Sequence, residues 1–343
     1  MEVIHLESLA VKYRPKEFED VIGQNSIVKI LSRQLELKEF KNCYLFCGPS
    51  GCGKTTIARI FADKINGGVG LPIEIDAASN NGVDNVKNIV TEAKERSIHG
   101  KYKIYIIDEC HSLTSQAWQA FLKCIEEPPA YTIFMFATTD PQKIPETILN
   151  RCMRFNIQKI QSTQIKSRLD YICKCEGFTN YEEVTDLISK MCKNQCRDGI
   201  ALLDKVAAYS TNFDVDIATA ILGGIPNKVL FALTNAIIDD KEADALRIIY
   251  EIYSNGSDLK LFVDLYLTFI LDITKYVLLG DLSITNFSEY DLQMLKNTSN
   301  FQDASKYFAW LADKVLNLKN MLKTDTNYKS TIEVAILQMC RLI

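Results

Sequence analysis

The sequence predicts an α/β domain built on a parallel sheet, followed by an all-helical region. In residues 1–160, short β-branched and aromatic runs alternate with helical patterns, which is typical of parallel strands joined by helices. After residue 157 the apolar residues repeat about every 3.6 positions, as in amphipathic helices. We therefore expect one sheet domain and a helical remainder in this chain of 343 residues.

Five runs are expected to form the strands of the sheet. The stretches 104–107, within the run at 103–107, and 132–137 are almost uninterruptedly apolar, as strands covered on both faces must be, so we place these two strands at the centre of the sheet. The other expected strands are residues 43–47, 73–76 and 155–157.

Glycine-containing breaks divide the helical remainder. The strongest break is Gly223–Pro226, and weaker ones occur at Gly177, at 255–257 and at Gly280. We therefore predict three domains, at residues 1–157, 158–220 and 221–343.

Composition and charge exclude several classes of protein. A hydrophobic content of 47% and a charged content of 24% are ordinary globular values, so the chain is expected to fold. The formal net charge of −4 means that any nucleic-acid contact must come from a local patch or from helix N-termini. The 11 cysteines, an odd number scattered along the chain, favour a reducing cytosol over a secreted disulfide framework.

Two segments bear on export and membranes. Residues 1–7 lack the basic and apolar regions of a secretion signal. The most apolar stretch, 259–279, contains charged residues and is interpreted as a buried helix, not a membrane span. The charged residues of this stretch are Lys260, Asp264, Asp272 and Lys275. We expect a cytoplasmic protein with no membrane partner.

A glycine-rich segment carries the strongest functional signal, because it matches G-x-x-x-x-G-K-[ST] between an expected strand and an expected helix. In this pattern, glycines let backbone amides surround a phosphate, Lys54 reaches the β- and γ-phosphate oxygens, and Thr55 can hold Mg²⁺. We predict a site for a nucleoside triphosphate and Mg²⁺, and assign Cys52 no redox role. The segment reads Gly48, Pro49, Ser50, Gly51, Cys52, Gly53, Lys54, Thr55 and Thr56.

Two adjacent acids follow the apolar strand at 103–107. Asp108 is placed to hold Mg²⁺, and Glu109 to polarise an attacking water. Two acids alone could form a solvated turn. Together with the glycine-rich segment they predict hydrolysis of the triphosphate, not binding alone.

Further motifs occur in one order along the chain: 13–15 with 18–24, 74–80, 126–129, 137–142, 150–152 and 197–198. With the two motifs above they resemble the clamp-loader ATPases of the AAA+ class, closest to the gamma/tau family of bacterial DNA polymerase III. The resemblance covers about residues 10–210. It implies an AAA+ nucleotide domain at 1–157, a helical lid at 158–220 and a helical oligomerisation collar at 221–343.

The resemblance implies roles for residues outside the glycine-rich segment. Thr139 would be a polar sensor near the γ-phosphate, and Arg197 a second sensor on the lid. Arg151 would be the arginine finger that completes a neighbouring subunit's site; the alternatives are a surface salt bridge for Arg151 and Arg154 as the finger. The adenine of ATP would be enclosed by Arg14, Val21 and Ile22.

The resemblance also implies partners. Such subunits assemble with other loader subunits into a ring, usually a pentamer, which holds a sliding clamp and primer-template DNA. In this chain, helix N-termini would contact DNA phosphates through Asn80, Asn81 and Ser115. Lys87 is a further candidate contact, with a solvated helix face as the alternative.

Two departures from the family are visible. Residues 65–72 are short and free of cysteine where cellular relatives usually carry a four-cysteine zinc module, so we expect no zinc. The chain also stops after the expected collar, without a tau extension. Both departures favour a short form encoded by a phage or another mobile element. We expect an ATP-hydrolysing clamp-loader subunit; the alternatives are a non-hydrolysing subunit of the same loader and a DExH-type helicase motor.

Overall fold

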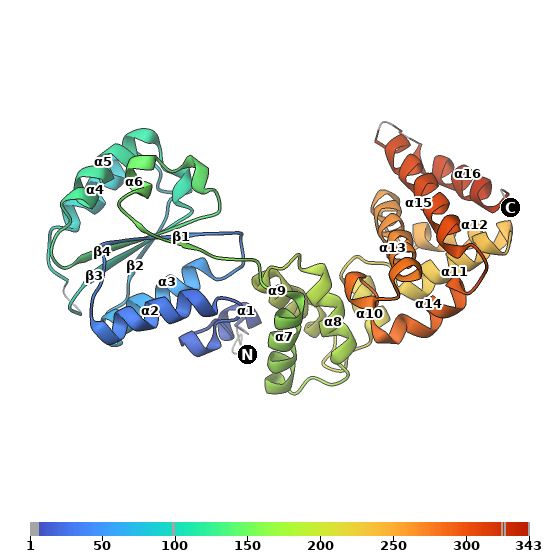
Figure 1. Ribbon diagram of the computed structural model, residues 1–343, viewed down its shortest axis with the longest axis horizontal. Helices are drawn as coiled ribbons and strands as arrows, with labels where there is room; N and C mark the ends of the chain where they lie inside the picture. The colour runs from blue at the N-terminus through green and yellow to red at the C-terminus, as the bar shows by residue number, and fades with distance from the viewer. Residues whose placement is uncertain (1–6, 98–99, 324, 326, 342–343) are drawn as a thin grey trace, which may run out of the picture. The chain divides into compact units, whose positions relative to one another are not determined.

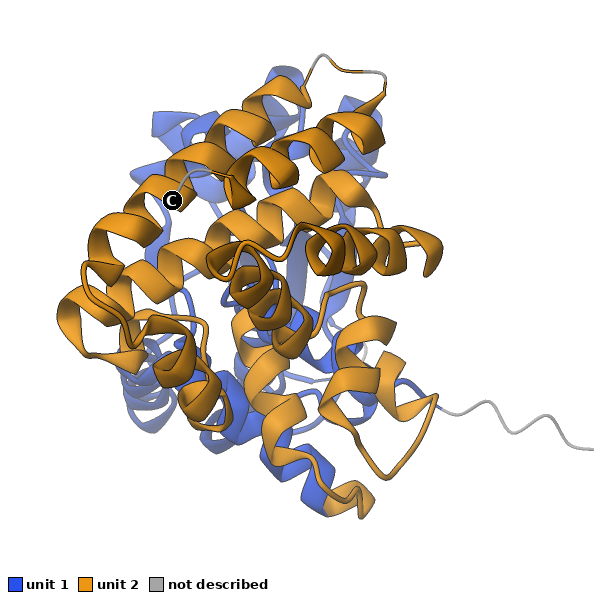
Figure 2. Cartoon of the chain, turned by 90° about the vertical axis from the view of Figure 1, so that its right-hand side faces the viewer, with its two compact units in different colours: residues 1–174, 191–204 blue, residues 175–190, 205–343 orange. Residues whose placement is uncertain are grey.

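The computed structural model describes residues 7–97, 100–323, 325 and 327–341. The chain forms two compact units, which Figure 2 shows in separate colours: residues 1–174 with 191–204, and residues 175–190 with 205–343. The secretion-signal prediction concerns residues 1–7, of which 1–6 lie outside the described residues. The three domains at 1–157, 158–220 and 221–343 stay a prediction, because compactness alone divides the chain at other positions.

The first unit is built on a parallel sheet of five strands in the order β2-β3-β4-β1-β5. The predicted central strands, β3 and β4, lie inside the sheet, which confirms their placement. The strands are β1 (Cys43–Cys47), β2 (Ile73–Asp76), β3 (Lys103–Asp108), β4 (Thr132–Thr138) and β5 (Met153–Asn156).

The fifth strand lies two residues earlier than the predicted run at 155–157. β5 is an edge strand, and it buries Phe155 while Arg154 and Asn156 are exposed. An edge strand therefore lacks the continuous apolar run that marks an inner strand, and the sequence pattern misplaces its start.

Helices cover both faces of the sheet (Figure 1): α4 and α5 on one face, α2 and α3 on the other. The inner strands alternate between these layers, so that Tyr105 packs with the α5 side and Ile106 with the α3 side. The helices of this unit are α1 (Leu9–Lys12), η1 (Phe18–Asp20), α2 (Asn25–Leu37), α3 (Lys54–Ile65), α4 (Val83–Glu92), η2 (Cys110–Ser112), α5 (Ser115–Glu126), η3 (Pro141–Lys143), α6 (Glu146–Leu149), and most of α7 (Ser162–Glu176) and α9 (Cys196–Ala207).

The parallel arrangement fixes where a site can form. The carboxyl ends of β1, β3 and β4 lie at the same edge of the sheet, so the segments that begin at Gly48, Glu109 and Thr139 are neighbours there.

The second unit is helical, as the period of its apolar residues predicts, and its buried residues between 230 and 340 form a hydrophobic core. Its longest helix, α13, spans the predicted residues 259–279 and buries one face. Asp258 caps its first turn, and Gly280 ends it with a φ of 67°. The helices are α8 (Glu182–Met191), α10 (Val215–Ile221), α11 (Asn227–Ile238), α12 (Glu242–Ser254), α13 (Leu259–Leu279), η4 (Leu282–Ile284), η5 (Glu289–Asp291), α14 (Leu292–Ser299), α15 (Ala304–Met321) and α16 (Tyr328–Cys340).

Across the part of the chain that the structure describes, none of the helices has both the length and the apolar composition that crossing a membrane requires.

Candidate nucleotide site

The segment between β1 and α3 forms a tight loop that only glycines allow at two positions. Gly53 precedes α3 with a φ of 99°, a left-handed conformation that disfavours other residues. A Cβ on Gly48 would lie 2.4 Å from the backbone oxygen of Ile157. Because α3 begins at Lys54, its first N–H groups face this loop without intrahelical partners and are available to an anion.

The side chain of Lys54 folds back over the loop. It is 6% exposed, and its Nζ donates to the carbonyl oxygens of Gly48 and Pro49, each at 3.0 Å. A buried ammonium bonded only to neutral carbonyls can exchange them for phosphate oxygens, which form stronger charge-assisted hydrogen bonds.

Thr55 and Asp108 meet beside the loop. The Thr55 hydroxyl donates to Asp108 Oδ2 at 2.6 Å, and Asp108 Oδ1 accepts from the backbone N–H of Glu109 at 2.9 Å. The contact brings a hydroxyl and a carboxylate together from two elements, and oxygen ligands of this kind are those that Mg²⁺ prefers. These two side chains fit the predicted magnesium site.

The carboxylate of Glu109 is held at the end of β3. Glu109 adopts a left-handed backbone with a φ of 46°, which costs roughly 1–2 kcal/mol for a residue other than glycine. Its Oε2 accepts from Thr139 Oγ1 at 3.2 Å and lies 3.2 Å from Nδ1 of His111. The structure therefore brings the predicted water-polarising residue and the predicted sensor into direct contact.

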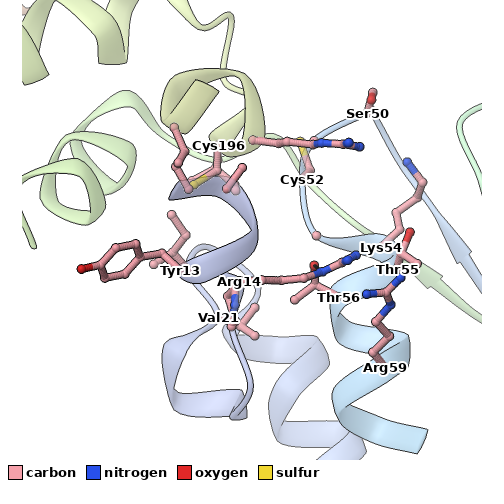
Figure 3. Close-up of a pocket in the computed structure, with 18 of the residues that line it drawn as sticks. Tyr13, Arg14, Val21, Ser50, Cys52, Lys54, Thr55, Thr56, Arg59 and Cys196 are labelled. Atoms are coloured by element: carbon pink, nitrogen blue, oxygen red, sulfur yellow. Dashed lines mark hydrogen bonds between the residues drawn. The ribbon is translucent and has the colours of Figure 1, made fainter. Parts of the chain in front are cut away.

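A cavity of about 430 Å³ opens beside the loop and the two acids (Figure 3), a volume typical of small-molecule sites. Of the residues predicted for the nucleotide site, Gly48, Pro49, Thr139 and Arg151 are not among those that line it. The predicted site residues that line it are Arg14, Val21, Ile22, Ser50, Gly51, Cys52, Gly53, Lys54, Thr55, Thr56, Asp108, Glu109 and Arg197.

Three guanidinium groups border the cavity, those of Arg14, Arg59 and Arg197. Arg14 and Arg59 extend toward Thr55 and Thr56 in Figure 3, and Arg14 Nε lies 3.4 Å from the Thr56 hydroxyl. Burial, followed by the nearby Arg59, lowers the pKa of Arg14. Crowded like charges of this kind favour an anionic ligand, which fits a triphosphate.

The cavity lining also includes four aliphatic side chains, those of Val21, Ile22, Ile160 and Ile200. Cys196 also lines the cavity, and burial raises the pKa of its thiol to about 11. Burial likewise raises the pKa of Cys52. Both thiols are neutral near pH 7, so these uncharged lining residues suit a flat, weakly polar base.

Among the described residues, no three His, Cys, Asp or Glu side chains are grouped so as to hold a metal ion. Thr55 and Asp108 would supply two oxygen ligands to Mg²⁺, a cation that usually takes its other ligands from phosphate and water.

Comparison with known proteins assigns the chain to a family. A family model described as DNA polymerase III, delta subunit, matches residues 72–161. The DNA polymerase III subunit tau of Bacillus subtilis is 33% identical, over 96% of this chain and 62% of that protein. The DNA polymerase III subunit gamma of Buchnera aphidicola subsp. Baizongia pistaciae is 30% identical, over 97% of this chain and 96% of that protein. The chain belongs to the DNA polymerase III gamma/tau family.

This chain is shorter than some of its relatives. It spans 62% of the length of the Bacillus subtilis tau subunit and 42% of that of the Escherichia coli tau subunit. The RuvB Holliday junction branch migration motor of Thermotoga maritima is similar in structure, with a TM-score of 0.52 and 20% identity over 66% of this chain and 79% of that chain. This likeness, with the five-stranded parallel sheet and the helical remainder, confirms the predicted fold class.

Arg151 of the gamma/tau chain lies outside the cavity, between α6 and β5. Its guanidinium pairs with Glu126 Oε1 at 2.7 Å and donates to the backbone oxygen of Thr147 at 2.7 Å. The side chain is 39% exposed, so the alternative of a surface salt bridge is realised within the single chain while the guanidinium stays accessible.

The predicted DNA residues of the gamma/tau chain lie near two helix N-termini. The backbone N–H of Thr114 donates to the Asn81 oxygen at 3.3 Å, which holds the segment before α4 against the start of α5. Thr114 caps α5, whose first residue is the predicted Ser115. Asn80 donates to the Asp76 backbone, and Lys87 is an exposed side chain 3.6 Å from Asp84.

Several residues that line the cavity were not predicted from the sequence. Arg59 lines the cavity and pairs with Glu74 of β2; its position one helical turn after Thr55 could have indicated that both face the same side of α3. Ile200 lies one helical turn after the predicted Arg197, a spacing that could also have indicated it, whereas Ile160 comes from a segment without a recognisable motif.

Proposed function

We propose that this gamma/tau chain is an ATP-hydrolysing subunit of a clamp loader, which uses ATP to place a ring-shaped sliding clamp on primer-template DNA. The observation that carries the proposal is the 2.6 Å contact between Thr55 and Asp108 beside an open phosphate loop. A subunit that only supports the ring would not require this pair together with a held Glu109.

Each side chain has a defined task in converting ATP and water to ADP and phosphate. Lys54 exchanges its two carbonyl partners for β- and γ-phosphate oxygens. Thr55 and Asp108 would hold Mg²⁺, which would neutralise charge on the phosphates. Glu109 accepts the proton of the attacking water, and Thr139 donates to the same carboxylate and fixes its direction.

Assembly supplies the remaining cation. Arg151, which is accessible on the single chain, leaves Glu126 and stabilises the γ-phosphate bound by a neighbouring subunit. Arg197, in the first turn of α9, contacts the nucleotide of its own chain, so that the position of α9 depends on which nucleotide is bound. The neighbours are other loader subunits in a ring, for which a pentamer fits the family, and the loader acts in the cytoplasm.

The DNA would lie along the N-termini of α4 and α5. Asn80, Asn81 and Ser115 are near these ends, where helix N–H groups favour phosphate oxygens, and Lys87 adds a positive charge. Contacts of this kind are independent of base sequence, as a loader of primed sites requires.

Glu109→Gln tests the function directly. Steady-state ATP hydrolysis is measured on the purified chain with loader partners, sliding clamp and primed DNA, and ATP binding is measured in parallel. We expect turnover to fall by roughly 10²-fold or more, because the amide cannot accept the proton, while ATP binding persists. The exposed Glu95→Gln in the same unit is the matched control and should retain full turnover.

The same measurements separate the alternatives. Clamp retention on primed circular DNA, without ATP turnover by the wild-type chain, would support a non-hydrolysing loader subunit. Strand displacement by the isolated chain would support a helicase motor. Full turnover in Glu109→Gln would remove the proposed role of Glu109.

A further inference from the structure

We propose that His111 is a positioning residue for hydrolysis, which fixes the carboxylate of Glu109 through its Nδ1 atom. The inference rests on the proposed function, in which Glu109 accepts a proton from water. His111 itself does not line the cavity, so it would act through Glu109 and not on the nucleotide.

The imidazole bridges two elements of the sheet edge. Its Nδ1 lies 3.2 Å from Glu109 Oε2 and 3.3 Å from Thr138 Oγ1. Thr138 is the last residue of β4 and has no exposed surface, so it is a rigid anchor. His111 thus ties the left-handed turn at Glu109 to a buried strand.

The two oxygens of the Glu109 carboxylate have different surroundings. Thr139 and His111 both approach Oε2 at 3.2 Å. Among the described residues, Oε1 has no hydrogen-bond partner, and the side chain is 36% exposed. The arrangement holds one oxygen and leaves the other to accept a proton, which is what a general base requires.

The geometry also assigns the proton on the ring. A carboxylate can only accept a hydrogen bond, so Nδ1 must carry a hydrogen to bond Glu109. Thr138 Oγ1 accepts from the Asp140 N–H at 3.0 Å and keeps a further lone pair, so Glu109 Oε2 and Thr138 Oγ1 can share the single Nδ1 hydrogen as a bifurcated bond. We therefore expect Nδ1, and not Nε2 alone, to be protonated in the folded chain.

Kinetics of three variants test the role. His111→Leu removes the nitrogen with little change in volume, and His111→Asn restores a nitrogen near the position of Nδ1. His111→Leu should lower kcat roughly tenfold, with KM for ATP changed less than about twofold. His111→Asn should recover most of the loss, and the adjacent Ser112→Ala should behave as wild type.

A double variant that also carries Glu109→Gln tests whether the effect of His111 on turnover depends on Glu109. If His111 acts only through Glu109, His111→Leu adds no further loss of turnover there. Wild-type kcat in His111→Leu, a loss confined to KM, or an additive loss in the Glu109→Gln background would each overturn the inference. These outcomes leave the proposed function intact, whereas absence of ATP turnover in the wild-type chain removes both.

Nitrogen NMR of the full chain provides a readout that does not depend on turnover. The chain has only 3 histidines, His5, His99 and His111, so labelled imidazole signals can be assigned with His111→Asn. We expect a protonated Nδ1 for His111, and a change of its signal in Glu109→Ala. An unprotonated Nδ1, or a signal unchanged by Glu109→Ala, would contradict the contact.

Discussion

The Thr55 hydroxyl donates to Asp108 Oδ2 at 2.6 Å and so joins the first turn of α3 to the end of β3. Two segments 53 residues apart in sequence meet at this contact. These two oxygen-bearing side chains would hold a magnesium ion beside a bound triphosphate, so nucleotide binding measured with and without the metal tests their role.

Thr55→Val should weaken ATP binding only when Mg²⁺ is present. The substitution removes one oxygen ligand at nearly constant volume, and we expect a roughly tenfold loss of affinity, or about 1.4 kcal/mol. Titration calorimetry with Mg²⁺ and with a chelator measures both values. Thr55→Ser should bind as wild type, and an equal loss in the chelator would show that the hydroxyl has no metal role.

Gly48→Ala should destabilise the first unit. The added Cβ would lie 2.4 Å from the backbone oxygen of Ile157, so the loop or β5 must move, at about 1–3 kcal/mol of unfolding free energy. Gly82→Ala is the control, because nothing lies within 4 Å of a Cβ at that position. Urea unfolding compares the two, and equal midpoints would contradict the expected clash with Ile157.

Two buried tyrosines should respond differently to loss of the hydroxyl group. Tyr44 accepts from the Lys41 N–H and donates to Gln34, whereas the Tyr105 hydroxyl has no partner among the described residues. Tyr44→Phe should lower the unfolding free energy by about 1 kcal/mol, and Tyr105→Phe should leave it unchanged or raise it. Urea unfolding of both variants decides this; a larger loss in Tyr105→Phe would be the contrary result.

The same tyrosines predict loss of stability in alkali. Burial raises the pKa of Tyr44 and of Tyr105 to about 12, above the ordinary value of 10. Each favours the folded state below pH 10, and this contribution is lost as the pH rises from 10 through 12. Tyr105→Phe should make unfolding less dependent on pH in that window, and an unchanged slope would argue against the raised pKa.

Substitution of Arg151 and substitution of its ion-pair partner Glu126 should have different effects on ATP turnover. The pair is partly exposed, so Glu126→Gln should change the unfolding free energy by less than about 1 kcal/mol and leave ATP turnover of the loader intact. Arg151→Ala should instead lower turnover by roughly 10³-fold while ATP binding persists. Equal, small effects of both substitutions would reduce Arg151 to a surface ion pair.

Local patterns predicted much of the fold and the centre of the site. The phosphate loop, the two acids and the inner strands are contiguous in sequence, so each carries its own signal. β5 was misplaced because an edge strand buries only alternate residues, such as Phe155. The contact between His111 and Thr138 could not be predicted, because it depends on two segments, 27 residues apart in sequence, that meet at the same edge of the sheet.

The central claim is that one chain binds the triphosphate and its neighbour completes the site. Mixing Glu109→Gln with Arg151→Ala, each nearly inactive alone, tests it most directly in the loader assembly. An interface between an intact Glu109 on one chain and an intact Arg151 on the next should restore ATP turnover well above the sum of the separate variants. Turnover of the mixture equal to that sum would contradict the shared site.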